Sequence, residues 1–497
     1  MNAQLVDVDH QARVVTDELA EELRRRLAPD RIITDATRLR TFECDAITGY
    51  RVVPALVAFP ETTEEVAAVV GVCAREHIPY VARGAGTGLS GGALPVAEGI
   101  VISLARMRKV SPPDVDNQRM TVEPGVTNAD ISKAVAAHDL YFAPDPSSQI
   151  VCTIGGNIAE NSGGAHCLKY GFTTNHVYAM TLVLPDASVV TVGGDGIEQC
   201  GPDLRGAVIG SEGTLAIATS ITVRLLRKPE DVQTMVADFP SAAQAGEAVS
   251  GIIAAGIVPA AVEMLDELAI EACEAAVHAG YSLDTAAALV VEIDGPAAQC
   301  EEDFDRVQEI CQEAGSTHVR VAADAGERML IWKGRKAAFA AMGRISPDYF
   351  VQDGVIPRTK LGEVLARMEE MASEAGLRVA NVFHAGDGNL HPLVLYNAAT
   401  EGESERGEEL STAIAELCVE MGGSITGEHG VGTDKACSMP KMFSEDDLEV
   451  MKRLRAAFDP TGISNPGKIF PTPRLCGEKP GPYREHPLEA SGQIERM

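Results

Sequence analysis

The segment Arg83-Gly-Ala-Gly-Thr-Gly-Leu-Ser-Gly-Gly92 decides how the first half of the chain folds. It contains the pattern G-x-G-x-x-G, which opens a helix in a Rossmann unit that binds a nicotinamide cofactor. Here the loop continues into Ala93-Leu-Pro95, which cannot continue a helix. The next expected strand runs into Leu104-Ala-Arg106 and offers no carboxylate for a ribose hydroxyl. We therefore reject the Rossmann interpretation, which leaves a loop whose backbone N–H groups bind a diphosphate or a glycine-rich structural turn.

Two later segments share the same small, hydrogen-bonding residues. One comprises Ala143-Pro-Asp-Pro-Ser-Ser148 and Thr153–Gly164, and the other is Gly210-Ser-Glu-Gly-Thr214. Their backbones can lie flat against a ligand, and their hydroxyl and amide groups can bind it. Three such segments within about 130 residues are difficult to explain as turns. They indicate a long cofactor with a diphosphate and a polar ring.

The residues before the first loop predict a β-α-β unit. Ala55–Phe59 is a short apolar strand, and Thr62 with Glu65 forms a capping box that starts a helix. The helix is expected to end near His77, and Tyr80–Ala82 is the second strand.

Apolar runs separated by glycines predict further short strands after the loop. These are Ile100–Ser103, Met120–Val122, Met180–Leu184, Val189–Val192 and Leu215–Leu225. From Lys228-Pro-Glu230, which has linker composition, strands alternate with Ala/Glu-rich helices, as in an α+β domain with an antiparallel sheet. The expected strands there are Thr234–Phe239, Ala260–Leu265, Leu289–Ile293 and His318–Val321. The expected helices are Ala242–Ala254, Asp266–Ala279, Gln299–Ala314, Leu361–Ala375 and residues 445–458.

The composition excludes several classes of function. The 497 residues include 42 Lys+Arg and 72 Asp+Glu, and the resulting charge of −30 repels nucleic acid and anionic membranes. The 11 cysteines form no C-x-x-C pair, which excludes the usual iron–sulfur and structural zinc spacings and favours reduced thiols. The N-terminus has no signal-peptide core, and no apolar run is long enough to span a bilayer. We therefore expect a cytoplasmic protein.

The glycine-rich segments resemble the FAD-binding domain of the vanillyl-alcohol-oxidase/cresol-methylhydroxylase flavoproteins. The similarity also includes Pro60-Glu-Thr-Thr-Glu-Glu-Val66 and runs in register from about residue 40 to 228, while Asn465-Pro-Gly-Lys468 resembles the C-terminal domain of FAD-linked oxidases. It implies that residues 83–92 bind the diphosphate of FAD and that segments 145–164 and 210–217 line its isoalloxazine ring. The implied FAD-binding residues are Arg83, Gly84, Ala85, Gly86, Thr87, Gly88, Leu89, Ser90, Pro144, Asp145, Ser147, Ser148, Thr153, Gly155, Gly156, Asn157, Ala159, Asn161, Ser162, Gly163, Gly210, Glu212, Gly213, Ile217 and Asn465. Thr87 stands where relatives with covalent FAD have a histidine, so we expect non-covalent FAD.

The resemblance also implies how the chain is divided, because 497 residues exceed one ordinary domain. The fold class is α+β, with an FAD-binding domain, a cap built on a ferredoxin-like antiparallel sheet and a C-terminal helical segment that returns to the FAD domain. The expected parts are a helical lead at 1–50, the FAD-binding domain at 51–228, the substrate or cap domain with the metal site at 229–440, the C-terminal segment at 441–474 and an irregular tail at 475–497.

Three histidines between residues 384 and 429 indicate catalytic chemistry. In Val382-Phe-His384-Ala-Gly-Asp-Gly-Asn-Leu-His391, a strand–turn–strand pattern can bring two imidazoles together, and Gly427-Glu-His-Gly430 adds a carboxylate and a third imidazole. Two histidines and a glutamate with an open position form the ligand set of a catalytic divalent metal, and Zn²⁺, Mn²⁺ and Fe²⁺ all fit by ligand type. The alternative is that His384 and His391 cap a hairpin through hydrogen bonds.

These histidine motifs resemble those of the D-2-hydroxyacid dehydrogenase branch of the family, and most of all its glycolate-oxidising members. The resemblance implies that His384, His391 and Glu428 bind the metal and that His429 is the catalytic base. In this scheme the metal polarises the substrate hydroxyl, His429 takes its proton, and the C2 hydride moves to flavin N5.

The substrate carboxylate requires a cation inside a protein of charge −30. The densest basic cluster of the second half is Ile331-Trp-Lys-Gly-Arg335-Lys336, and we select Arg335 as the bidentate clamp, with Lys336 and Arg344 as weaker candidates. Leu393 occupies a position where 2-hydroxyglutarate enzymes have a polar residue, which favours a short acid such as glycolate or D-lactate.

The chain contains neither an iron–sulfur spacing nor a nicotinamide motif, so its electrons are expected to pass to another protein or to a diffusible acceptor. The resemblance implies a second FAD-binding subunit and an iron–sulfur subunit as partners, through which the protein would associate with the membrane. One alternative is a D-lactate or D-2-hydroxyglutarate dehydrogenase that uses an electron-transfer flavoprotein or a quinone. Another is a non-catalytic flavin-binding subunit, which would be expected to lack the metal ligands and the base.

Overall fold

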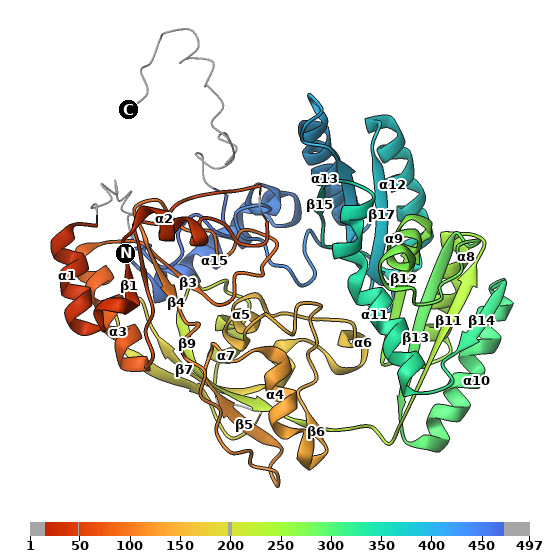
Figure 1. Cartoon of the computed structure of the whole chain (residues 1–497), viewed down its shortest axis with the longest axis horizontal. Helices are drawn as coiled ribbons and strands as arrows, with labels where there is room; N and C mark the ends of the chain where they lie inside the picture. The colour runs from red at the N-terminus through yellow and green to blue at the C-terminus, as the bar shows by residue number, and fades with distance from the viewer. Residues whose placement is uncertain (1–14, 48, 197–200, 472–497) are drawn as a thin grey trace.

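The structure is a computed structural model that describes residues 15–47, 49–196 and 201–471. In Figure 1 the first half of the chain and its C-terminal segment lie on the left, and the sheet and helices of residues 231–420 lie on the right. The expected tail at 475–497 and the first 14 residues of the expected lead lie outside the described residues.

The first sheet has the order β1-β2-β4-β3, and β3 and β4 pair in parallel. Its strands are β1 Ile32–Ile33, β2 Leu56–Ala58, β3 Tyr80–Arg83 and β4 Ile100–Ser103. Helices α1 Asp17–Arg26, α2 Ala36–Leu39 and α3 Thr63–Glu76 belong to this region, and α3 begins after Thr62, whose side chain accepts a hydrogen bond from the Glu65 N–H. Residues 84–99 connect β3 to β4 without a helix, as the sequence predicted.

The second sheet is antiparallel and has the order β5-β9-β7-β8. Its strands are β5 Arg119–Val122, β7 Val177–Val183, β8 Val189–Gly193 and β9 Ile217–Arg224, and a separate pair joins β6 Leu140–Tyr141 to β10 Leu226–Arg227. The helices between them are α4 Asn128–Val135, α5 Ile154–Glu160, α6 Cys167–Tyr170 and α7 Leu204–Val208. The second glycine-rich segment therefore contains a short helix, α5, that starts directly after Thr153.

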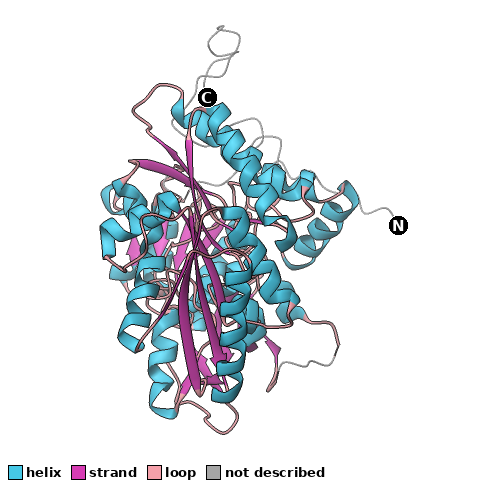
Figure 2. Cartoon of the chain, turned by 90° about the vertical axis from the view of Figure 1, so that its right-hand side faces the viewer, coloured by secondary structure: helices cyan, strands magenta, loops and turns pink. Residues whose placement is uncertain are grey.

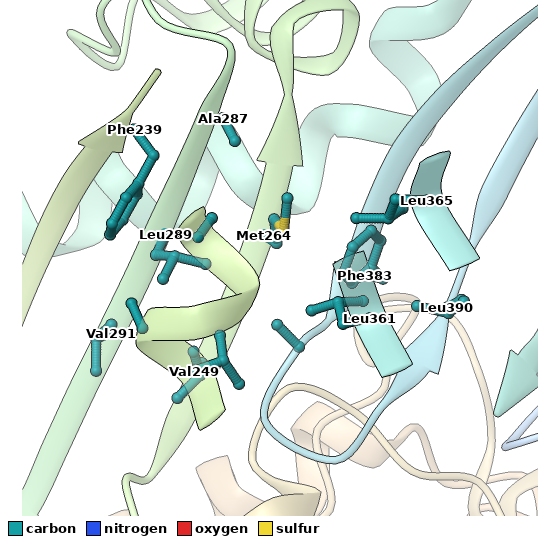
Figure 3. Packing of buried hydrophobic residues seen from close by; sticks show 14 of the residues in the cluster. Phe239, Val249, Met264, Ala287, Leu289, Val291, Leu361, Leu365, Phe383 and Leu390 are labelled. Carbon is teal, nitrogen blue, oxygen red and sulfur yellow. The ribbon is translucent and has the colours of Figure 1, made fainter. Parts of the chain in front are cut away.

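The cap is built on a nine-stranded antiparallel sheet (Figure 2). Its strands are β11 Asp231–Phe239, β12 Ala261–Asp266, β13 Ala287–Gly295, β14 His318–Val321, β15 Asp348–Val351, β16 Gly354–Val355, β17 Arg378–His384, β18 Asn389–Leu390 and β19 Pro392–Tyr396. Its helices are α8 Ala242–Ala254, α9 Glu267–Val277, α10 Ala297–Glu313, α11 Ala325–Ala341, α12 Leu361–Ala375 and α13 Glu403–Glu420. Buried residues of α8, α10, α12 and α13 pack on one face of the sheet, and those of α9 and α11 pack on the other. Figure 3 shows the first of these clusters, in which Phe239 comes from β11, Met264 from β12 and Phe383 from β17.

The alternation of side chains along the strands decides which residues face α9 and α11. Leu265 of β12, Val382 of β17 and Leu393 of β19 belong to the buried cluster on that face. Residues two positions away along a strand share a face, so Glu263, His384 and His391 lie on it too. Strands β12 and β17, with the residue that directly precedes β19, thus bring a carboxylate and two imidazoles beneath helix α11.

The C-terminal segment returns to the first half of the chain, as the fold class predicted. Helix α14 Met439–Met442 overlaps its start, and helix α15 Glu445–Phe458 lies within it. The Asn465 N–H donates to the Tyr80 carbonyl at 2.8 Å, and its side-chain amide donates to the carbonyls of Gly92 and Glu212 at 2.9 and 2.6 Å. Lys468 donates to the Leu94 carbonyl at 2.9 Å. The chain end is therefore part of the wall around the first glycine-rich loop.

Helices α11 and α13 were not predicted. In α11 a charged residue, Arg335, lies on the buried face at 2% exposure, which hides the apolar period of the helix. In α13 the first two turns are mostly acidic, and the apolar residues gather only after Gly407.

Cys437 is disulfide-bonded, so the expectation of reduced thiols is wrong at this position, whereas Cys44, Cys73, Cys152, Cys167, Cys273, Cys300, Cys311 and Cys418 are free.

Candidate active site

A cavity of about 370 Å³ lies where the glycine-rich segments meet α11 and the 427–430 loop. Eighteen of the predicted FAD-binding residues line it: Arg83, Gly84, Ala85, Gly86, Thr87, Gly88, Leu89, Ser147, Ser148, Thr153, Gly155, Gly156, Asn157, Ala159, Ser162, Glu212, Gly213 and Ile217. Its wall also includes His429, Glu428, Lys336 and Phe339. The three segments far apart in the sequence are thus brought to one cavity.

Seven predicted FAD-binding residues do not line this cavity: Ser90, Pro144, Asp145, Asn161, Gly163, Gly210 and Asn465. Several hold the cavity together. Ser90 donates through its hydroxyl to the His429 carbonyl at 2.9 Å, which ties the first loop to the histidine loop. Gly163 allows Glu428 to approach, because a Cβ there would lie 2.6 Å from Glu428 Oε2.

The floor of the cavity contains a pair of buried carboxyl groups, Glu160 and Glu212. Both oxygens of Glu212 accept backbone N–H bonds of 2.7 Å from Val431 and Gly432. Burial and the charge of Glu212 raise the pKa of Glu160 well above its usual value, and Glu160 Oε2 has no hydrogen-bond partner. Glu160 is therefore more readily protonated than an ordinary carboxyl, and its free Oε2 is available to a polar ligand group.

His384, His391 and Glu428 meet as a candidate metal centre. Their ligand atoms all lie within 4.8 Å of one another, and the Nε2 atoms of His384 and His391 lie 3.4 and 3.2 Å from Glu428 Oε1. The two imidazole centroids are 5.1 Å apart. The predicted strand–turn–strand pattern and the 427–430 loop therefore produce one convergent set of ligand atoms.

Glu263 completes this centre from behind. Its carboxylate accepts a hydrogen bond from His384 Nδ1 at 2.7 Å, which leaves Nε2 free for a metal. Arg335 Nη2 forms an ion pair of 2.6 Å with Glu263 Oε2, and Arg335 Nε is buried without a hydrogen-bond partner. Arg335 thus lies beside the metal centre rather than on the cavity wall, while Lys336 is on the wall and Arg344 is exposed.

Asp353 holds the loop that carries Glu428 and His429. Its side chain accepts backbone N–H bonds from Gly427 at 2.9 Å, Glu428 at 3.1 Å and His429 at 2.9 Å. Lys435 Nζ lies 3.5 Å from the same carboxylate. Asp353 therefore fixes the backbone from which the carboxylate ligand and the candidate base project.

His429 is positioned to act as a base. Its ring is stacked on that of His391, with centroids 4.9 Å apart and planes at 15°, and its Nδ1 is buried without a hydrogen-bond partner. Burial lowers the pKa of His429 to about 4. The imidazole is therefore neutral near pH 7 and can accept a proton.

Glu263, Asp353 and Glu160 were missed by the sequence analysis. Glu263 had a signal, because it is a lone carboxylate inside the apolar strand expected at 260–265. Asp353 precedes a glycine, and Glu160 lies within the second glycine-rich segment, so neither differs in type from an ordinary turn residue.

Comparisons with known proteins agree with this architecture. Residues 54–193 match the family described as FAD binding domain, and residues 228–469 match FAD linked oxidases, C-terminal domain. The p-cresol methylhydroxylase structure with substrate bound has the same fold, with a TM-score of 0.78 over 90% of this chain and 96% of that chain at 17% identity.

The chain belongs to the FAD-linked oxidase family and is an FAD-dependent oxidoreductase. It is 48% identical to glycolate oxidase subunit GlcD of Escherichia coli (strain K12), over 92% of this chain and 91% of that protein. It is also 35% identical to glycolate oxidase subunit GlcD of Bacillus subtilis (strain 168), over 92% and 97%, and 34% identical to D-lactate dehydrogenase of Archaeoglobus fulgidus, over 83% and 91%. Among the described helices, none is long and apolar enough to cross a membrane.

Proposed function

We propose that this oxidoreductase converts a short 2-hydroxyacid, glycolate or D-lactate, to the 2-oxoacid. The observation that carries the proposal is that a neutral imidazole, His429, faces the FAD-binding cavity beside a buried cluster of two histidines and a glutamate. The names of the similar proteins, glycolate oxidase subunits and a D-lactate dehydrogenase, support this substrate class.

The residues of the cavity fit FAD. The backbone of Gly84 approaches Thr153 so closely that a Cβ would collide with the threonine hydroxyl. Thr153 Oγ1 and Glu160 Oε2 are buried on the wall without hydrogen-bond partners, as expected for groups that face a polar ligand. We assign the 18 predicted residues on the wall to FAD binding. We still expect the cofactor to be non-covalent, because Thr87 replaces the histidine that relatives with covalent FAD have at this position.

The charges around Glu428 fit a divalent cation. Arg335 pairs with Glu263 and Lys435 pairs with Asp353, but Glu428 is faced by two imidazoles. Although burial opposes it, hydrogen bonds from His384 and His391 hold the pKa of Glu428 well below its usual value. A buried carboxylate faced by two imidazole nitrogens is the donor set of a catalytic Zn²⁺, Mn²⁺ or Fe²⁺ site, and a bound cation would replace the protons that the imidazoles now share with Glu428.

The chain's own residues divide the reaction between them. When bound, FAD supplies the acceptor for the C2 hydride, and the divalent ion supplies positive charge beside the substrate hydroxyl. His429 accepts the hydroxyl proton, and its stacking on His391 fixes the plane of the ring. Lys336, on the cavity wall, orients the substrate carboxylate, and Arg335, whose Nη2 pairs with Glu263 behind the wall, adds positive charge near it.

The electrons then pass to partner subunits, which we propose to be a second FAD-binding subunit and an iron–sulfur subunit. The similarity to proteins named as glycolate oxidase subunits supports this arrangement. The protein would be cytoplasmic and would reach the membrane through these partners. A D-lactate or D-2-hydroxyglutarate dehydrogenase with a flavoprotein or quinone acceptor is the second candidate.

Anaerobic bleaching of the flavin tests the proposal. Glycolate or D-lactate should reduce the flavin of the purified holoenzyme, and metal removal by a chelator should abolish this reduction. The variant His429→Ala should retain FAD but lose activity by about 10²–10⁴-fold, because it lacks the base. Unchanged reduction in the His429→Ala variant would place the base elsewhere, and a strong preference for D-2-hydroxyglutarate would favour the second candidate.

A further inference from the structure

A second cavity of about 360 Å³ lies on the far side of Phe339 from the FAD-binding cavity. Leu89 and Phe339 are the two described residues that line both cavities. Leu89 belongs to the first glycine-rich loop, whose backbone is fixed by the cofactor site. Phe339 is a side chain on α11, so its rotation or removal is the simplest way to join the two spaces.

Phe339 lies directly against the reacting groups. It is one helical turn after Arg335 on the same helix, and its ring makes an edge contact with His391, with centroids 6.0 Å apart and planes at 66°. A substrate held between His429 and Lys336, which line the same cavity, therefore has the Phe339 ring at its end.

The second cavity contains polar groups that an extended ligand would satisfy. Lys435 Nζ and Gln352 Oε1 are buried in its wall without hydrogen-bond partners. The contact of Lys435 with Asp353 is an ion pair of 3.5 Å, so its N–H donors remain available. The buried Lys435 ammonium favours a ligand that ends in a carboxylate, whereas Gln352 Oε1 can only accept a hydrogen bond from a donor group of such a ligand.

We propose that Phe339 limits substrate length, and that the second cavity is a blocked extension of the substrate site. The inference rests on the proposed function. With Phe339 in place the site accepts two- and three-carbon 2-hydroxyacids. With the ring removed, a longer 2-hydroxyacid with a terminal carboxylate would extend towards Lys435.

Four holoenzyme variants test this assignment: Phe339→Ala, the milder Phe339→Leu, Phe350→Ala and the double variant Phe339→Ala/Lys435→Met. Phe350 lines only the second cavity, so its removal enlarges that cavity without opening the boundary. For each variant, kcat/KM is measured for glycolate and for D-2-hydroxyglutarate with an artificial dye. Binding of glyoxylate and of 2-oxoglutarate is measured through the flavin absorbance.

The ratio of kcat/KM for the five-carbon acid to that for glycolate should rise about 10-fold or more in Phe339→Ala, and affinity for 2-oxoglutarate should rise with it. Phe339→Leu should give a smaller gain, Phe350→Ala none, and the double variant should lose most of the gain. An unchanged ratio in both Phe339 variants with intact FAD content, or an equal gain in Phe350→Ala, would overturn the inference. A wild-type enzyme that oxidises no short 2-hydroxyacid would instead refute the proposed function.

Discussion

Glu263 shows how a residue that is not itself one of the candidate metal ligands can determine what the site binds. It is fully buried, and it is shared between His384 and Arg335. Its carboxylate fixes His384 with Nδ1 as the donor and turns Nε2 towards Glu428 and His391. The same carboxylate holds the Arg335 guanidinium next to the centre, so one side chain orients both a candidate metal ligand and the candidate substrate clamp.

The variant Glu263→Gln should therefore weaken metal binding by about 10–100-fold, because an amide is a poorer acceptor for the His384 N–H than a carboxylate. The measurement is a metal-competition titration of the apoprotein, with FAD content determined in parallel.

Glu292→Gln is a matched control for this change. Glu292 is also a buried carboxylate of the cap sheet, but it bonds to His166 and Trp332 instead of the metal ligands. A loss of metal affinity as large in Glu292→Gln as in Glu263→Gln would show that the effect is one of general stability.

At the scale of elements, the loop after Gly427 is held on several sides. Asp353 binds its N–H groups at residues 427–429, Glu212 binds those at 431 and 432, and the Ser90 carbonyl binds those at 433 and 434. The loop has no regular secondary structure over these residues, so its geometry comes from these anchors. The cap thus positions one end of the loop and the FAD-binding segments the other.

The variant Asp353→Asn should disturb the Glu428 end of the loop. An asparagine offers one neutral oxygen where the aspartate accepts three N–H bonds, and loss of charge-assisted bonds costs about 1.5–3 kcal/mol each. We expect kcat/KM for the 2-hydroxyacid to fall about 10-fold or more, with the flavin spectrum unchanged. Steady-state kinetics with the dye acceptor measure the effect, and wild-type kcat/KM in this variant would show that the other anchors suffice.

Across the whole molecule, His166 joins the FAD-binding half to the cap. Its ring lies 3.0 Å from Asp145 and 3.2 Å from Glu292 of β13. Although burial opposes it, these two carboxylates raise the pKa of His166 to about 10. Lys169 and Tyr170 reach Asp294 of the same strand, so the connection is a row of polar contacts.

Because this pKa is raised above the usual value near 6.5, His166 stabilises the fold fully below about pH 6.5, and the contribution is lost as the pH rises through about 10. The variant His166→Gln should therefore be less stable than wild type at pH 6, by about 3 kcal/mol or less, and the difference should vanish near pH 10. Thermal unfolding across this pH range measures it.

His138→Gln provides the control, because His138 is an exposed histidine. The His138→Gln variant should have the same thermal unfolding temperature as the wild-type protein at every pH. A constant difference between His166→Gln and wild type from pH 6 to pH 10 would contradict the charged state of His166.

The sequence by itself determined the local parts of this protein. Helix α3 with its Thr62 cap, helices α8, α12 and α15, and strand β4 follow from periodicity and capping, which depend on neighbouring residues. The glycine-rich segments predicted a cofactor, because backbones with small side chains can lie close against the flat rings of a ligand. His384 and His391 were predictable as a pair, since a single turn joins their strands.

Only the tertiary structure decided which charges meet. The buried partners of the centre come from β12, α11 and the residues before β16, more than 70 positions from at least one of the groups they contact. No local pattern encodes such a contact, because a buried ion pair depends on two strand registers and a helix position at once. For the same reason the boundary at Phe339 was invisible in the sequence: an aromatic residue on a helix looks like core until the cavities on both sides of it are known.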